Sequence, residues 1–128
     1  MNFNAKSPWV LVVGLLGATG VALGAVASHA LSDAQAAVAV ERASTYQLLH
    51  AIAILVLLGF GGRTMAIARL LMLAGVTGFS GAIYAKYLLG LAAMGSVAPL
   101  GGSLLILSWL IVAAAWFTSS LSRATAHK

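Results

Sequence analysis

Four long apolar stretches, separated by short polar breaks, fill almost the whole chain. A run of about 20 apolar residues forms a helix that crosses the ~30 Å hydrocarbon core of a bilayer. Hydrophobic residues make up 62% of the sequence and charged residues only 7%, a composition far from that of soluble domains. Backbone polar groups cannot reach water inside lipid, and the alternating segments of a membrane β-barrel are absent, so the spans must be helices. The sequence predicts an all-α integral membrane protein, a four-helix transmembrane bundle.

The apolar stretches predict spans at about 8–30, 43–60, 64–89 and 99–121. Their connections are too short to hold another folding unit, so we expect residues 1–128 to form a single four-span membrane domain. The first stretch resembles a secretory signal peptide, with Lys6 before the apolar run and small residues before Ser28. We expect it to be retained as a span, because its apolar run is longer than that of a usual signal peptide.

The connection between the first two spans carries a helix-start pattern. Its residues Ser32-Asp33-Ala34-Gln35 have the spacing of a capping box, in which the serine and glutamine side chains bond free N–H groups. The alanine- and valine-rich stretch 34–42 then predicts a short helix lying in the outer interface, before the chain turns inward near Ser44 and Thr45. One long continuous second helix is the alternative.

The basic residues predict the orientation in the membrane. With the N-terminus inside, the cytoplasmic side has Lys6, Arg63, Arg69, Arg123 and Lys128, and the outer side has Arg42 and Lys86. This excess favours a multi-pass membrane protein with both termini inside, N-in and C-in. The basic residues are scattered singly, which argues against nucleic acid as a partner. The absence of cysteine excludes disulfides and thiolate metal sites.

Small residues recur at helical spacing on three of the predicted spans. They predict faces on which helix backbones approach closely, because van der Waals contact has to supply the association of helices in lipid. The residues assigned to these faces are Gly17, Gly20, Gly24, Gly75, Gly78, Gly101, Gly102 and Ser108. They are expected to hold the bundle or an oligomer together, with the lining of a pore as the alternative.

Polar residues gather in the predicted outer half of the spans. Arg42, Tyr46 and His50 recur every four residues and therefore share one helix face. The predicted cluster consists of His29, Glu41, Arg42, Tyr46, His50, Ser80 and Tyr84. We expect His29 and His50 to approach each other inside the bundle, with Tyr84 nearby.

This cluster has three interpretations. The first is a structural network of hydrogen bonds between helices. The second is a site for a small apolar ligand or a quinone, since polar residues within spans often mark function. The third is ligation of a metal or haem by His29 and His50, although two histidines alone underdetermine a metal site. We expect neither a metal nor another cofactor.

Four motifs carry a resemblance to a known family. They are Gly24-Ala25-Val26-Ala27-Ser28-His29-Ala30-Leu31, Glu41 with Tyr46-Gln47-Leu48-Leu49-His50-Ala51, Phe79-Ser80-Gly81-Ala82-Ile83-Tyr84, and Ala98-Pro99-Leu100-Gly101-Gly102 with Trp109. In order and spacing the chain resembles the small bacterial inner-membrane family catalogued as domain of unknown function 423. Departures from the family pattern are Val26, Ala27, Ala82, Ala98 and Lys86. The resemblance implies four spans and no established activity.

Three classes of function remain. The favoured one is a non-catalytic accessory or assembly subunit of a larger membrane complex, with the lipid bilayer and other membrane subunits or further copies of the chain as partners. The alternatives are a binder of a small apolar ligand, quinone, haem or metal, and a small channel or carrier. Hydrolytic motifs such as GxSxG and HExxH and a phosphate-binding loop are absent, so an enzyme is not expected.

Overall fold

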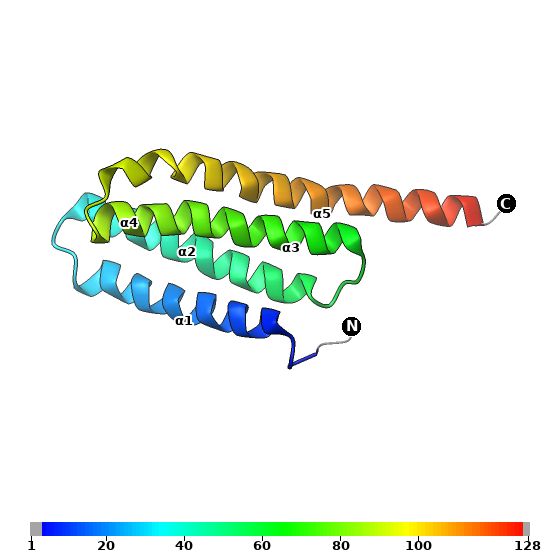
Figure 1. Cartoon of the computed structure of the whole chain (residues 1–128), viewed down its shortest axis with the longest axis horizontal. Helices are drawn as coiled ribbons and strands as arrows, with labels where there is room; N and C mark the ends of the chain where they lie inside the picture. The colour runs from blue at the N-terminus through cyan, green and yellow to red at the C-terminus, as the bar shows by residue number, and fades with distance from the viewer. Residues whose placement is uncertain (1–3, 127–128) are drawn as a thin grey trace.

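The computed structural model describes the backbone of residues 4–126 and the side chains of residues 4–117. Every regular element in this part of the chain is helical, so the all-α prediction is confirmed (Figure 1). The elements are α1 (Pro8–His29), α2 (Ala34–Leu57), α3 (Arg63–Val76), a π-helical turn (Thr77–Gly81), α4 (Ala82–Leu88), a 3-10 helix (Ala92–Ser96) and α5 (Ala98–Ala126).

Helix α2 is continuous, so the predicted short interfacial helix is wrong and the alternative of one long helix is correct. Its N-cap is Asp33 rather than Ser32, and the Asp33 carboxylate accepts a hydrogen bond from the Ala36 N–H at 2.6 Å. No glycine or proline interrupts Ala34–Leu57, so nothing in the backbone forces a bend. The Thr45 hydroxyl returns to the carbonyl of Glu41 on the preceding turn, which keeps it compatible with the helix.

Helices α3 and α4 form one long rod joined by the π-helical turn. The turn has the sequence Thr-Gly-Phe-Ser-Gly, whose two glycines weaken the ordinary helical preference. It is also the place where α5 comes closest, because a Cβ at Gly78 would lie 3.2 Å from the Gly101 Cα. The π turn therefore coincides with a glycine-to-glycine crossing of two helices.

The four long rods lie side by side, with α2 in contact with α1, α3 and α4 (Figure 1). The most extensive contacts join α1 to α2 and α3 to α5. Near one end, the buried residues Ile54, Leu57, Ala68 and Met72 form an apolar core. Among the described residues, α2 and α5 do not pack along each other, which leaves a groove between them.

Among the described residues, three segments are long and apolar enough to cross a membrane: Pro8–His29, Arg63–Leu88 and Ala92–Phe117. Helix α2 is not among them, because its first half carries charged and polar residues. It is nevertheless well buried, with nine buried residues. Neighbouring helices therefore shield much of α2. Some of its polar residues face these helices, and others face the surroundings of the bundle.

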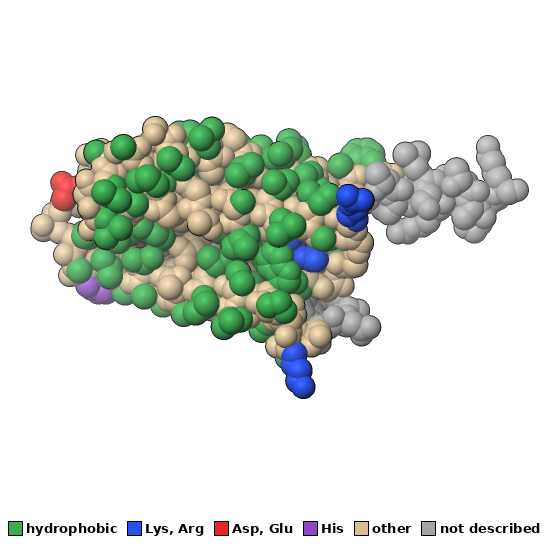
Figure 2. Space-filling view, in the orientation of Figure 1, with side chains coloured by type: hydrophobic (Ala, Val, Ile, Leu, Met, Phe, Trp, Pro, Cys, Tyr) green, Lys and Arg blue, Asp and Glu red, His purple; other side chains and the backbone are tan. Residues whose placement is uncertain are grey.

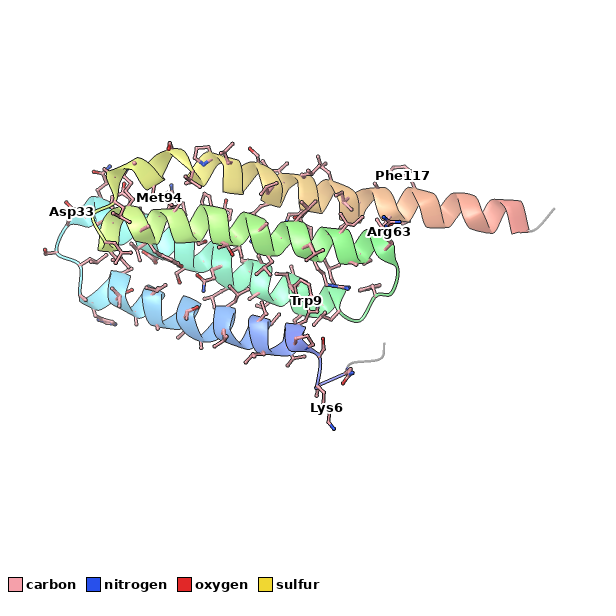
Figure 3. The ribbon with its side chains drawn as sticks, viewed as in Figure 1. Lys6, Trp9, Asp33, Arg63, Met94 and Phe117 are labelled. Atoms are coloured by element: carbon pink, nitrogen blue, oxygen red, sulfur yellow. The ribbon has the colours of Figure 1, made fainter. Side chains whose placement is uncertain are left out.

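Charged side chains gather at the two ends of the bundle (Figure 2). Lys6 and Arg63 lie at the end where the chain begins, and Asp33 lies at the opposite end (Figure 3). Trp9 is at the Lys6 end, where the Arg69 guanidinium lies over its ring at 5.8 Å from the centroid. The predicted inner residues Arg123 and Lys128 lie outside the described side chains.

Candidate functional site

Gln47 of α2 is the centre of the polar network between helices. Its side chain is 4% exposed and bonds two other helices. The amide Nε2 donates to the Leu16 carbonyl at 2.7 Å and to the Thr19 hydroxyl at 2.8 Å, both on α1. The amide Oε1 accepts from the Tyr84 hydroxyl of α4 at 2.9 Å. One side chain of α2 thus links α1 to α4.

Two serines complete this network at backbone carbonyls. The buried Ser44 hydroxyl of α2 donates to the Gly20 carbonyl of α1 at 2.8 Å. The Ser80 hydroxyl in the π-helical turn donates to the Ala43 carbonyl of α2, also at 2.8 Å. Each bond satisfies a hydroxyl that would otherwise be buried at a cost.

His50, three residues after Gln47 on α2, bonds α5 instead and is 6% exposed. Its Nε2 accepts a hydrogen bond from the indole Nε1 of Trp109 on α5 at 3.1 Å. Its Nδ1 lies 2.7 Å from the Tyr46 carbonyl, which can only accept. These partners assign the neutral tautomer with the proton on Nδ1. Both ring nitrogens are therefore engaged within the protein.

His29 lies apart from His50, so the predicted pairing of the two histidines is wrong. The His29 side chain is exposed at the C-terminal end of α1. Gly20 of α1 faces Leu48 of α2. Measured along the helices from this contact, His29 lies about 14 Å toward the Asp33 end of the bundle, and His50 lies about 3 Å toward the Arg63 end. The tertiary partner of His50 is Trp109. Within the described residues, no group of three His, Asp or Glu side chains is placed to hold a metal ion.

Three residues of the predicted cluster are exposed on α2: Glu41, Arg42 and Tyr46. Tyr46 is 42% exposed, and its ring packs on Phe79 of the π turn at a centroid distance of 5.1 Å. Of the predicted cluster, the structure therefore buries only His50 and Ser80, with Tyr84 half-buried.

Two recesses share His50 and Trp109 and together form the groove between α2 and α5. The first, of about 380 Å³, includes Tyr46, Phe79 and Gly102 in its lining. The second, of about 530 Å³, continues toward Phe60. Both volumes fall in the range of small-molecule sites, about 300 to 1,000 Å³. The His50–Trp109 hydrogen bond crosses the groove between them.

The small residues differ in how closely a neighbour approaches them. A Cβ at Gly20, Gly24 or Gly75 would lie 2.8 Å from an atom of the adjacent helix, and Gly101 is enclosed by the backbone of the π turn. Gly17 has no such neighbour within 4 Å, and at Gly102 the nearest atom would be the Phe79 ring at 3.7 Å. The fully buried Ser108 bonds the Leu105 carbonyl of its own helix at 2.7 Å.

Sequence reasoning missed three residues of these networks: Gln47, Trp109 as a partner of His50, and Arg69 as a helix cap. The Arg69 guanidinium donates to the Leu57 carbonyl at 2.9 Å, at the C-terminal end of α2, where a cation is favoured. The sequence shows Gln47 as a polar residue directly after Ser44-Thr45-Tyr46, and nothing local sets it apart from these neighbours. For Trp109, no local signal indicates the partner on another helix.

Comparisons with known proteins give relatives without a described activity. The model of the family "Protein of unknown function (DUF423)" matches residues 23–102. A UPF0382 membrane protein of Haemophilus influenzae is 34% identical over 89% of this chain and 97% of its own length. One from Staphylococcus aureus is 34% identical over 84% of this chain and 93% of its own length. No solved structure matches the chain significantly. The chain therefore belongs to the DUF423 family of membrane proteins of unknown function.

Proposed function

We propose that this chain is a non-catalytic subunit of a larger membrane assembly in the bacterial inner membrane. The observation that carries the proposal is that the buried polar side chains form hydrogen bonds within the fold. In the described part of the chain, every buried side-chain nitrogen and oxygen has a hydrogen-bond partner except Nε of Arg69. Groups committed to partners within the fold are not free to bind substrate or transfer protons. A network of this kind holds helices in register.

The proposal includes four crossings with both termini in the cytoplasm. Helix α2 has 24 residues, which give it a length of about 36 Å, more than the ~30 Å hydrocarbon core. It runs from the end of the bundle at Asp33 to the end at Arg63 (Figure 3). Lys6, Arg63 and Arg69 at the second end favour its placement in the cytoplasm, since cytoplasmic loops are enriched in basic residues.

A channel or carrier is less well supported by the same contacts. The core at the Arg63 end consists of Ile54, Leu57, Ala68 and Met72. Leu57 is the most exposed of the four at 7%. A water path would need polar or ionisable groups along its length. This core favours a closed bundle that acts through its surfaces.

The test is the size and composition of the particle extracted from native membranes in a mild detergent. We expect the tagged chain to migrate in an assembly larger than its 13.0 kDa mass and to bring defined membrane proteins in fixed ratio. The double variant His29→Ala, His50→Ala should keep this assembly, because neither imidazole is needed for chemistry. A chain that migrates alone under all mild conditions would contradict the proposal.

A further inference from the structure

A third recess adjoins the groove at its Tyr46 end. This head recess, of about 250 Å³, is lined by Val38, Glu41, Arg42, Thr45 and Tyr46. Tyr46 also lines the first part of the groove, and His50 with Trp109 joins that part to the second. The three recesses therefore follow one another along one face of α2, from its charged first half to its apolar second half.

The polarity along this path is graded. The head recess presents a carboxylate, a guanidinium and the hydroxyls of Thr45 and Tyr46. Within the described residues, the Tyr46 hydroxyl has no hydrogen-bond partner, so it is free to bind a ligand. In the groove, the nitrogens of His50 and Trp109 bond each other or the Tyr46 carbonyl. The groove thus offers a ligand mainly apolar surface.

The length of the groove suits a lipid tail. Its lining on α5 extends from Pro99 to Val112, about 20 Å of helix. Half of the ~30 Å hydrocarbon core is about 15 Å. The groove is therefore long enough to hold the part of an acyl chain that lies in one leaflet.

We propose that the head recess and the groove bind one zwitterionic phospholipid with a primary ammonium head. The guanidinium of Arg42 would hold the phosphate, which such side chains bind with charge-assisted hydrogen bonds. The carboxylate of Glu41 would hold the ammonium, and the Tyr46 hydroxyl would bond a phosphate or ester oxygen. The two charged side chains of the recess sum to zero, which matches a zwitterion better than an anionic lipid. One acyl chain would lie in the groove across the His50–Trp109 pair.

The hydrogen bonds in the groove argue against a quinone as the occupant. A quinone head needs donors for both of its carbonyl oxygens, and among the described residues that line the groove only the Tyr46 hydroxyl is free. The Trp109 N–H points to His50, and the His50 N–H points to the Tyr46 carbonyl. The charged groups that can bind a ligand head are instead found at the head recess, in the half of α2 that begins at the Asp33 end of the bundle.

The first experiment measures lipid retained by the purified chain. After extensive washing in mild detergent, lipids are extracted and quantified per chain, and native mass spectrometry counts the bound molecules. We expect about one phosphatidylethanolamine per wild-type chain. Gly102→Leu should remove most of it, because a Cβ fits at this position and the added side chain enters the groove. The matched control Gly14→Leu, with no atom within 4 Å of its Cβ, should retain it.

The second experiment tests the head recess. The washed protein is challenged with mixed micelles of phosphatidylethanolamine or phosphatidylglycerol. Arg42→Gln should weaken retention of phosphatidylethanolamine about tenfold, which corresponds to the loss of one charge-assisted hydrogen bond. Arg63→Gln, at the other end of the bundle, should leave retention unchanged. If Gly102→Leu fails to fold, Ser103→Phe fills the same recess from an exposed position.

Several results would overturn the proposal. They are the absence of retained phospholipid, equal loss in Gly14→Leu and Gly102→Leu, and equal retention of the anionic lipid. Recovery of a quinone in place of phospholipid would have the same effect, as would a second copy of the chain occupying the groove. None of these results depends on whether the chain joins a larger assembly.

Discussion

Gly101 and Gly102 are adjacent in α5, yet alanine should lower stability at Gly101 and should not lower it at Gly102. A Cβ at Gly101 would overlap backbone atoms of Gly78 and Phe79 and lie 2.8 Å from the Gly75 carbonyl oxygen. At Gly102 the nearest atom would be a Phe79 ring carbon at 3.7 Å, an ordinary contact. Backbone cannot move aside as the end of a flexible side chain can. Gly101→Ala must therefore push α5 away from the π turn.

The cost can be estimated from these contacts. Overpacking costs about 1–3 kcal/mol, and we take about 3 kcal/mol because the obstruction is backbone. Alanine regains at most about 1 kcal/mol over glycine in a helix. The free energy of unfolding should thus fall by about 2 kcal/mol for Gly101→Ala, whereas Gly102→Ala should leave it unchanged or raise it by up to about 1 kcal/mol.

The assay is reversible unfolding in mixed micelles with increasing dodecyl sulfate, followed by tryptophan fluorescence and circular dichroism. The two variants should shift the midpoint in opposite directions, or only Gly101→Ala should shift it. Equal shifts for both variants would refute the close approach of α5 to the π turn.

Further predictions concern the polar networks. Gln47→Leu removes three hydrogen bonds between helices and should lower the unfolding free energy by about 2 kcal/mol, since such bonds average about 0.6 kcal/mol in membranes. Tyr84→Phe removes one of the three and should cost about 0.6 kcal/mol in the same unfolding assay. A double-mutant cycle of His50→Phe and Trp109→Phe should give a coupling of about 0.6 to 1.7 kcal/mol. A coupling near zero would show that the two rings do not bond.

The sequence predicts three rods well because length and hydropathy are local properties. The expected span 8–30 starts with α1 and ends one residue after it. The expected span 64–89 is shifted by one residue from the rod Arg63–Leu88. The start of α2 was missed, because its first half is polar and read as interfacial. Hydropathy does not distinguish a helix shielded by protein from one lying at the membrane surface.

The candidate site depended on tertiary partners that helical periodicity does not supply. Spacing placed Arg42, Tyr46 and His50 on one face of α2, and all three line the path of recesses. The partner of His50 was expected on α1, but that face of α2 is turned toward α5. Gln47, only one residue from Tyr46, lies about 100° around the helix and so reaches α1 and α4 instead.

Cysteine labelling tests most directly whether α2 crosses the membrane and the chain makes four crossings. The chain contains no cysteine, so single substitutions can be labelled without background. In intact spheroplasts, a membrane-impermeant maleimide should label Ser32→Cys and Ser96→Cys, at one end of the bundle. Gly61→Cys, between α2 and α3, should be labelled only after the membrane is opened. Labelling of Ser32→Cys and Gly61→Cys from the same side would contradict the account.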